Sequence, residues 1–314
     1  MKDLILNNKN EKELIILELT EYYHAIPNID RACSSVIENS ISIFLPLTRI
    51  DKSKIYKKFI SNNQTLEIDN ELFEKVEIKG RLLGQIHKDV LESLLTLPKI
   101  YSKNTAQFKI KTTAYKLLQQ MQRNTSDKKW LIQKLDEIKE CGIKLFYKNA
   151  NEKDESFNFG FISSIKVTEE KQIEITFSPE YTYFLAKNEL LDYGEYIDDI
   201  LSLKKEMKKI QEKLKLKRGI NTEFIKAIIR YMLIHKGNNS QISIDNLTKK
   251  LKLDVIMTKE ELKDNLIDLK RELVQKLLKD KFGIKLTKED KSTLSFNSLP
   301  NKKHYYLNNN KTLF

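Results

Sequence analysis

The chain has few of the residues and patterns on which cross-linking, membrane anchoring and secretion depend. Only two of its 314 residues are cysteines, Cys33 and Cys141, and their spacing is not that of metal ligands. Two such thiols fit a reducing cytosol better than a disulfide-stapled secreted fold. The longest apolar stretch, 41–47, contains Ser42 and Pro46 and is far shorter than the roughly 20 residues of a membrane span. The N-terminus turns polar too early for a signal peptide, so we expect a cytoplasmic protein with no membrane partner.

Sequence patterns typical of enzymes are also missing. No glycine-rich phosphate-binding loop of the Walker type occurs, so no ATPase site is expected. The four histidines, His24, His87, His235 and His304, stand alone in the sequence, and His87 is expected to be packed or on the surface. Nucleases that nick plasmid origins need two histidines flanking one apolar residue to hold a metal, plus a nearby tyrosine, and this histidine pair is absent. We therefore expect a protein that is not an enzyme, with no catalytic residue, metal or cofactor.

Positive charge is in excess. Lys and Arg outnumber Asp and Glu by 56 to 44, which gives a net charge of +12. An excess of this sign favours a polyanionic partner such as nucleic acid, or an acidic surface. Lys, Asn and Ile are all abundant and Arg is scarce, as expected from AT-rich coding DNA. The charge alone therefore favours nucleic acid only modestly.

One block of sequence occurs twice. Residues 128–135 (KKWLIQKL) are echoed 142 residues later by residues 270–277 (KRELVQKL). Each copy runs on into the tetrapeptide GIKL, at 142–145 and at 283–286, with one residue dropped in the second copy. A chance match is the alternative in a chain rich in Lys, Ile and Leu. The similar order of the flanking sequence favours two related structural units.

Helix caps and hydrophobic spacing predict the same order of elements around both copies. In the first copy we expect helix 83–97, strand 108–111, helix 113–121, helix 126–140 and strands 143–147, 157–167 and 172–177. In the second copy we expect helix 224–235, strand 242–244, helix 245–251, helix 258–279 and a hairpin of 284–286 with 293–296. Pro98 would stop the first helix, and Gly142 and Gly283 would end helices in the left-handed conformation. Helix, strand, helix, helix, hairpin is the order of a winged helix-turn-helix domain.

The predicted fold class is therefore α+β, mainly helical, with two winged helix-turn-helix domains in tandem. The expected segments are a helical N-terminal segment of unknown role at 1–70, a first winged-helix domain at 71–190, a linker helix at 191–218, a second winged-helix domain at 219–300 and a tail at 301–314. Within the N-terminal segment, amphipathic runs at 11–24 and 32–43 predict helices.

The expected linker helix has apolar residues in a heptad pattern, namely Tyr196, Ile200, Leu203, Met207, Ile210 and Leu214. This seam could form a coiled coil, or it could be the face by which the helix lies against a domain. Eight Lys or Arg and two Glu occupy its other faces between Lys204 and Arg218, which makes phosphate contact possible.

In a helix-turn-helix the second helix enters the major groove, while the wing and helix N-termini grip phosphates. In the second copy a helical wheel places leucines on one buried face, at 262, 266, 269, 273 and 277. Basic residues fall on one flank of that face, namely Lys259, Lys263, Lys270 and Arg271. Acidic residues fall on the other flank, at 261, 264, 268 and 272. Such segregation suits a helix laid along a phosphate backbone, although a solvated helix with internal ion pairs is the alternative.

The first copy has Lys128 and Lys129 at the matching positions, with Gln133 one turn further on. The basic pair begins its helix in the first copy and is expected in mid-helix in the second. Gln can pair with adenine edges and Arg with guanine edges if they reach a base. The expected DNA-binding residues are Lys128, Lys129, Gln133, Lys134, Lys259, Lys263, Lys270, Arg271 and Gln275. Trp130 is expected in the core. The expected wings, near 148–157 and 288–292, carry as many acidic as basic residues, so their charge alone does not favour phosphate binding.

Four segments resemble the iteron-binding replication initiators of theta-replicating bacterial plasmids, a family built from two winged helices. These are residues 84–90 (GQIHKDV), residues 173–180 (IEITFSPE), residues 225–230 (IKAIIR) and the helix with Lys270 and Arg271. The resemblance covers about 75–300, leaves the N-terminal segment unmatched, and is carried mainly by the order of the segments.

The resemblance implies a protein that binds direct repeats in double-stranded DNA beside an AT-rich origin, helps to open the duplex, and recruits host initiator and replicative helicase proteins. It also implies a homodimer, formed through the first domain, in equilibrium with the monomer, the dimer repressing the protein's own promoter. The second winged helix would supply the main sequence readout. One half of an iteron would then be contacted by Lys263, Lys270, Arg271 and Gln275, and the other by Lys128, Lys129, Gln133 and Lys134.

Two other functions remain open at this point. One is a transcription regulator with the same tandem domains and no role in replication. The other is a protein-interaction scaffold whose positive charge reflects coding bias. Salt dependence of DNA binding would separate the scaffold from the others, because true phosphate contacts lose affinity steeply as salt rises.

Overall fold

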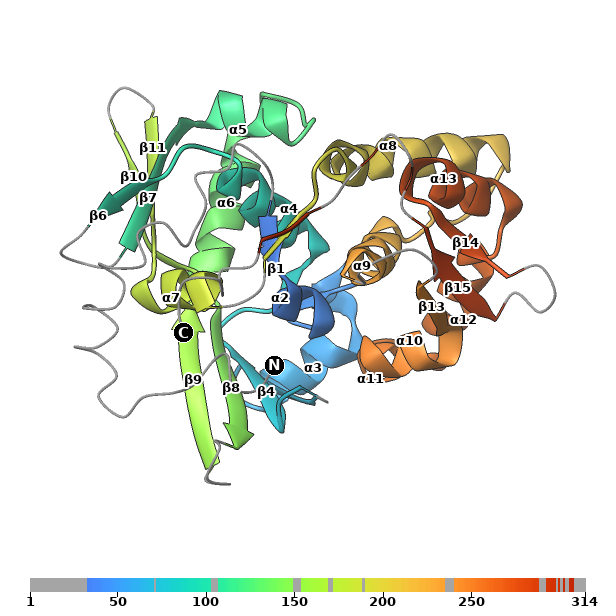
Figure 1. Ribbon diagram of the computed structural model, residues 1–314, viewed down its shortest axis with the longest axis horizontal. Helices are drawn as coiled ribbons and strands as arrows, with labels where there is room; N and C mark the ends of the chain where they lie inside the picture. Colours follow the sequence, from blue (N-terminus) through green and yellow to red (C-terminus); the bar gives the residue numbers. More distant parts are fainter. Residues whose placement is uncertain are drawn as a thin grey trace.

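The computed structural model describes residues 33–70, 72–102, 107–148, 154–168, 172–187, 190–234, 240–287, 292–297, 299, 302 and 305–307. Over these residues the chain is a mixed α/β fold in which short sheets are joined and covered by helices (Figure 1). No helix in this part of the chain combines the length and the apolar character needed to cross a bilayer.

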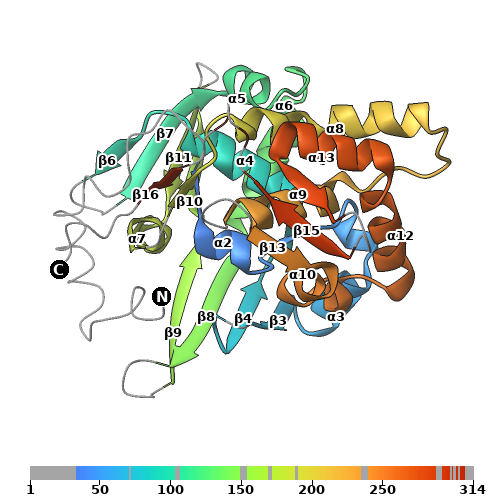
Figure 2. The ribbon, with the colours of Figure 1, turned by 45° about the vertical axis from the view of Figure 1, so that its right-hand side comes forward.

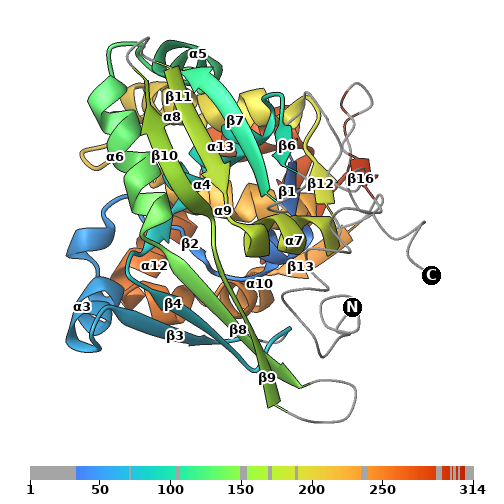
Figure 3. The same ribbon diagram turned by 90° about the vertical axis from the view of Figure 1, so that its left-hand side faces the viewer.

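The N-terminal part of the described chain builds two four-stranded sheets. Its elements are β1 (Cys33–Ser35), α2 (Val36–Ser40), β2 (Phe44–Leu45), the 3₁₀ turn η2 (Ile50–Lys52), α3 (Lys54–Ser61), β3 (Thr65–Asp69), β4 (Lys75–Lys79), β5 (Leu83–Gly84), α4 (Gln85–Leu95), β6 (Ile100–Ser102), β7 (Gln107–Thr113), α5 (Ala114–Gln120), α6 (Lys128–Lys139), β8 (Gly142–Lys148), β9 (Asp154–Gly160), β10 (Ile162–Val167), β11 (Gln172–Phe177), α7 (Pro179–Lys187) and β12 (Leu190–Asp192). The strand orders are β3-β4-β8-β9 and β10-β11-β7-β6 (Figure 3).

The C-terminal part is mostly helical around one small sheet of order β13-β15-β14. Its elements are α8 (Tyr196–Lys213), α9 (Thr222–Leu233), β13 (Ser240–Ser243), α10 (Ile244–Lys250), α11 (Leu253–Ile256), α12 (Lys259–Leu269), α13 (Glu272–Phe282), β14 (Ile284–Leu286), β15 (Thr293–Phe296) and β16 (Tyr305–Leu307). Strand β12 pairs on one side with β1 and on the other with β16, which ties the two ends of the described chain together.

Residues 33–70 contain three strands besides α2 and α3, whereas the sequence predicts mainly helix there. The expected helix at 32–43 is reduced to the five residues of α2, because β1 and β2 on either side are held by pairing with distant strands. Strand β3 pairs with β4, so this segment is built into the first half of the fold. The other expected helix, at 11–24, lies outside the described residues.

The two halves share an order of elements and a strand arrangement. In the first half, α4, β7, α5 and α6 are followed by β10 and β11, and β11 lies between β7 and β10. In the second half, α9, β13, α10 and the later helices are followed by β14 and β15, and β15 lies between β13 and β14. The first half has two additions among its strands, β6 at the edge of this sheet and the β8–β9 hairpin, which joins a different sheet.

The repeated sequence block does not coincide with this structural correspondence. The GIKL tetrapeptide lies in the additional strand β8 in the first half and at the start of β14 in the second. The matched helices are also out of register, since α6 buries Leu131 and Leu135 while α13 buries Val274 and Leu278, one residue beyond the matched leucines. The match of letters is therefore not a match of positions, which favours a chance match.

The single helix expected at 258–279 is wrong, because α12 ends at Leu269 and α13 begins at Glu272. Arg271 between them has extended backbone angles, φ −64° and ψ 136°. The break is stabilised by the side chain of Gln275, whose amide donates to the carbonyl oxygen of Leu269 at 2.6 Å and so satisfies a group that the helix end leaves free. The expected leucine face is broken with it, and of its five members only Leu269 is fully buried.

Two caps agree with the sequence, and the caps of α6 and α10 differ from it. The Thr113 hydroxyl accepts from the backbone of Lys116 at the start of α5, and Thr258 forms a capping box with Glu261 at the start of α12. Helix α6 begins later than expected, at Lys128 with Asp127 as its N-cap residue. Helix α4 ends at Leu95, before Pro98 as expected.

The two glycines expected to end helices differ. Gly283 has φ +68° and is the C-cap of α13, whereas Gly142 is in strand β8, so the expectation for Gly142 is wrong. A Cβ atom on Gly283 would lie 1.9 Å from the carbonyl oxygen of Asn297, while one on Gly142 would meet nothing within 4 Å.

Gly283→Ala is therefore expected to destabilise the protein by about 1–3 kcal/mol, since it adds both left-handed strain and a backbone clash. Gly142→Ala is the matched control and is expected to change stability by less than about 1 kcal/mol, because alanine fits an open strand position. Urea unfolding followed by circular dichroism measures both. Equal effects of the two substitutions would contradict this account of Gly283.

One hydrophobic core runs through both halves, and α4 of the first half packs against α9 of the second. The apolar seam of α8 packs against α9 and α13 of its own chain, with Tyr196, Ile200, Leu203 and Met207 buried (Figure 2). Leu214, the last residue of the seam, lies beyond the helix and is exposed. The seam is thus the face by which α8 lies against the second half.

Candidate nucleic-acid interface

Helix α6 presents Lys128 and Lys129 at its N-terminus, where both side chains are exposed. Within the described part of the chain neither lysine has a salt-bridge partner. A helix N-terminus carries free backbone N–H groups and a partial positive charge, so two lysines there suit contact with a phosphate. The structure thus places this expected pair where it can meet a polyanion.

The other two expected residues of α6 are held by Glu137. The Gln133 amide donates to one oxygen of this carboxylate at 3.0 Å, and the Lys134 ammonium lies 2.5 Å from the other. Arg81 also binds it at 2.8 Å and His87 at 2.6 Å. Burial would raise the pKa of Glu137, but the bonds from His87 and Lys134 outweigh it and hold the pKa far below its usual range. Lys134 is therefore neutralised by its own helix.

His87 in this cluster is buried and accepts a hydrogen bond from the backbone N–H of Gly84 through Nδ1. Its Nε2 must then carry the proton and donate to Glu137, which defines a neutral imidazole. Burial lowers the pKa of His87, and the bond to Glu137 opposes this only in part. Of the two positions expected for His87, packed or on the surface, the structure shows the packed one.

Because His87 is neutral when folded but can take a proton when unfolded, folding stability is expected to fall as pH drops below about 6.5. In the window below about pH 6.5 in which His87 stays neutral in the folded state, the slope is at most about 1.4 kcal/mol per pH unit for this one group. His87→Asn keeps an acceptor for Gly84 and removes the titration, so its stability should vary less across this window. Urea unfolding at pH 5 and pH 7 tests this, and equal slopes for variant and wild type would argue against it.

Helix α12 presents an exposed face with the remaining expected lysines. Lys259, Lys263 and Lys270 are exposed on it, together with Ile267, whose side chain is 45% exposed. In the described residues these three lysines have no salt-bridge partner. An apolar side chain flanked by lysines is a combination that suits a DNA groove, where it can touch a thymine methyl group.

Arginine side chains bind two of the acidic residues of α12, Asp264 and Asp268. Asp268 is only 2% exposed and lies between Arg218 and Arg271, each 2.7 Å from one of its carboxylate oxygens. The Asp264 carboxylate lies 3.4 Å from the guanidinium group of Arg218, and the Glu261 side chain is used in the capping box. Of the acids expected on this flank only Asp268 is buried, while Glu261, Asp264 and Glu272 are exposed, so α12 presents lysines on one flank and acidic residues on the other.

Two expected DNA-binding residues are occupied within the fold. Arg271 is bound to Asp268, and both ends of the Gln275 amide are used, since its oxygen accepts from the backbone of Leu286 in β14 at 3.0 Å. These residues fix the junction of α12 and α13 to the neighbouring strand. Lys270 and Arg271 also lie directly before α13 rather than in mid-helix, so the basic pairs of both halves precede or open a helix.

A buried ionic cluster joins the two halves. Arg230 of α9 is 1% exposed and binds Glu92 at 2.5 Å, Asp89 at 2.8 Å and the Gln85 side-chain oxygen at 2.7 Å, all three on α4. Lys226, one turn earlier on α9, also binds Asp89. Burial raises the pKa of Glu92 against the opposing effect of Arg230, while the two carboxylates raise the pKa of Arg230 despite its burial.

Sequence reasoning did not identify this cluster, although a signal exists. Polar residues recur at Gln85, Asp89 and Glu92 on one face of α4, and at Lys226 and Arg230 on one face of α9, within otherwise apolar helices. Such spacing on two mainly buried helices predicts facing partners. Both helices lie in segments that carried the resemblance given above.

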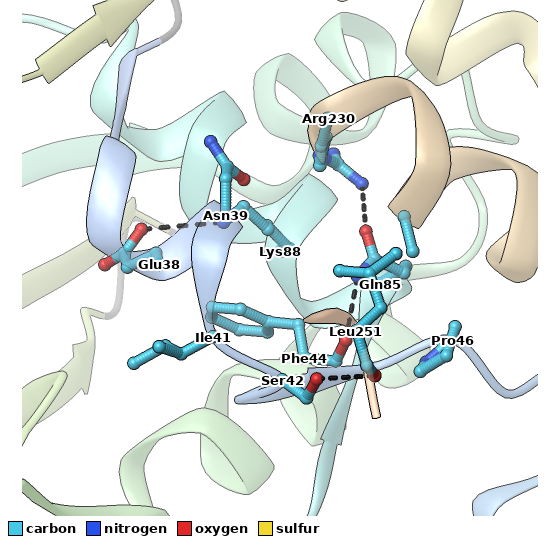
Figure 4. A pocket seen from close by; sticks show the side chains of 11 residues that line it. Glu38, Asn39, Ile41, Ser42, Phe44, Pro46, Gln85, Lys88, Arg230 and Leu251 are labelled. Carbon is cyan, nitrogen blue, oxygen red and sulfur yellow. Dashed lines mark hydrogen bonds and ion pairs between the residues drawn. The ribbon is translucent and has the colours of Figure 1, made fainter. Parts of the chain in front are cut away.

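Lys88 extends the cluster toward α2 (Figure 4). Its ammonium group is buried, lies 3.7 Å from Glu38 and 4.9 Å from the centre of the Phe44 ring, and borders a small cavity of about 20 Å³. Burial lowers the pKa of Lys88 to about 8, with Glu38 and Glu92 opposing the shift. A cavity of this size holds about one water molecule, which would supply the hydrogen bond that Lys88 lacks.

Several remaining expectations can be placed. Trp130 packs against the core and is covered by the guanidinium group of Arg123 at 3.7 Å, in agreement with a core role. Burial raises the pKa of the Cys141 thiol, which makes it unreactive. Among the described residues no group of His, Cys, Asp and Glu could hold a metal ion. The tips of both expected wings, and His235, lie outside these residues.

Comparison with known proteins gives a likeness in fold only. No family model matches the sequence, and no curated protein matches it. Among solved structures, a crystal structure of domains 2 and 3 of RctB is similar with a TM-score of 0.45 and 11% identity, covering 75% of this chain and 91% of that one. A second crystal structure of the same domains has a TM-score of 0.38 and 13% identity with the same coverage.

Proposed function

We propose that this protein binds double-stranded DNA sequence-specifically at origin repeats and initiates plasmid replication, and that it also represses its own gene. The observation that carries the proposal is that each half exposes lysines on a helix that precedes its strand pair, on α12 in the second half and at the start of α6 in the first. The resemblance of four sequence segments to iteron-binding initiators supports the replication role. Each half would act as a winged helix-turn-helix.

The two halves would contact DNA differently. In the second half, Lys259, Lys263 and Lys270 would bind phosphates on either side of a groove, with Ile267 between them against base edges. In the first half, Lys128 and Lys129 would bind backbone at the start of α6. Arg271 and Gln275 would act as positioning residues, because their side chains hold the α12–α13 junction in place.

The proposed partners follow from this role. They are origin repeats in double-stranded DNA, a host initiator and a replicative helicase, with a homodimer of this chain in equilibrium with the monomer. We propose a binding protein that is not an enzyme, acts in the cytoplasm and needs no cofactor. It would act on the duplex through its binding contacts, without catalysing a reaction.

The first test is a fluorescence-anisotropy titration with a duplex from the DNA flanking the gene, using an unrelated duplex of equal length as competitor. A preference of at least about a hundredfold for the flanking DNA is expected of a specific binder. Equal and weak binding to both duplexes would refute the proposal and leave the scaffold function. A plasmid carrying the gene and its flanking repeats then tests replication, since a regulator without that role would bind but not maintain the plasmid.

A further inference from the structure

A second surface of positive charge lies at the end of α8. Both glutamates near it have lysine partners, Glu206 with Lys209 at 3.1 Å and Glu212 with Lys208 at 3.9 Å. Three exposed lysines follow at alternate positions, and within the described ranges none of them has a salt-bridge partner. This basic strip consists of Lys213, Lys215 and Lys217.

The basic strip is held in a defined turn. Lys215 has a left-handed backbone, φ +50°, and the backbone N–H of Leu216 donates to the carbonyl oxygen of Gln211 at 3.1 Å. This is the hydrogen bond of a Schellman helix end, which turns the chain sharply out of the helix. Leu216 packs against the core beside the turn. The three lysines therefore project from an ordered part of the surface.

Arg218 attaches the same turn to α12. Its guanidinium group binds Asp268 at 2.7 Å and the carbonyl oxygen of Asp264 at 2.9 Å. The other oxygen of Asp268 binds Arg271, so one buried carboxylate joins the turn to the α12–α13 junction. Figure 2 shows the end of α8 and α12 along the same edge of the molecule. The basic strip thus lies beside α12, next to the flank of that helix that carries Asp264 and Asp268.

We propose that the basic strip binds the sugar-phosphate backbone of the DNA where the duplex continues beyond the bases contacted by α12. The inference rests on the proposed function and adds a contact from outside the two halves. Lysine suits this role, because it is a compact charge that binds phosphate without selecting a base. Arg218, by contrast, is paired with the carboxylates of Asp264 and Asp268. Arg218 therefore anchors the turn, and the three lysines supply its positive charge.

The test compares the wild type with Lys213→Gln/Lys215→Gln/Lys217→Gln in anisotropy titrations at 50 to 200 mM salt. Losing three phosphate contacts should make the slope of log K against log salt shallower by about 2–3. The matched control is Lys79→Gln/Lys144→Gln/Lys148→Gln, which removes the same charge from β4 and β8, away from α8 in Figure 1. The control is expected to change the slope by less than about 1.

A second measurement locates the contact. The titrations are repeated on a series of duplexes shortened from one end. Once the outer phosphates are removed, the strip variant and the wild type should have the same slope of log K against log salt. A strip variant with the slope of the wild type, or with the slope of the control, would overturn the inference. If the wild type shows salt-dependent binding without preferring the flanking DNA, the proposed function fails while the strip is still decided by its slope. Absence of any DNA binding overturns both.

Discussion

Replacing Arg230 by methionine is expected to lower the free energy of unfolding by about 3–5 kcal/mol, a large part of the 5–15 kcal/mol typical of a folded domain. The substitution leaves Asp89 and Glu92 buried close together, with Lys226 bound to Asp89 and only the longer-range charge of Lys88 acting on Glu92. Two carboxylates in a medium of low polarity cannot both stay ionised without cost. Urea unfolding at pH 7 measures the loss.

Two variants show whether the loss comes from uncompensated charge. Arg49→Met removes an exposed arginine and is expected to change stability by less than about 0.5 kcal/mol. Arg230→Met/Glu92→Leu removes one charge from each side and leaves the Lys226–Asp89 pair intact, so it should recover much of the stability lost in the single variant. A double variant as unstable as the single one would mean that Arg230 acts through packing.

The second large effect is expected in DNA binding. Substituting alanine for four exposed lysines, Lys128, Lys129, Lys263 and Lys270, should reduce the slope of log K against log salt by about 3–4, since each phosphate contact contributes about 0.9. Stability should change little, because in the described part of the chain none of the four is in a salt bridge. Anisotropy titrations over a range of salt concentrations, together with urea unfolding, give both quantities.

Arg271→Ala is the informative partner of these variants. Arg271 binds the buried Asp268, so its removal should cost about 1–3 kcal/mol of stability. Its effect on the salt slope should be smaller than that of Lys270→Ala, which lies next to it in the chain. If instead Arg271→Ala lowered DNA affinity strongly and left stability unchanged, Arg271 would be a direct DNA contact.

Local signals predicted much of the fold. Caps at Thr113 and Thr258 and the stop before Pro98 depend on neighbouring residues alone, and the structure has all three. The break between α12 and α13 is stabilised by the nearby Gln275 and also by a distant partner, since Arg218 reaches Asp268 from 50 residues away. A helical wheel treats residues 258–279 as one rod and cannot include such a partner.

The candidate site was predictable to a similar degree. Exposure of Lys128, Lys129 and Lys263 follows from their helical positions, and the structure agrees. The hydrogen bond from the backbone of Leu286 in β14 to Gln275 could not be predicted from the sequence, because it depends on how the strand packs beside the helix. The same holds for the ionic cluster, whose members Glu92 and Arg230 are 138 residues apart.

The ionic cluster between α4 and α9 has a consequence for the spacing of the DNA half-sites that the protein would accept. Sliding or rotating one half against the other would pull Arg230 away from two buried carboxylates, so the joint is costly to bend. If both halves contact DNA as proposed, a stiff joint fixes the distance and the rotation between their two contact surfaces. B-form DNA turns once in about 10–10.5 base pairs. Such a protein would therefore bind only repeats whose two half-sites are separated by the right number of base pairs, in addition to having the right sequence.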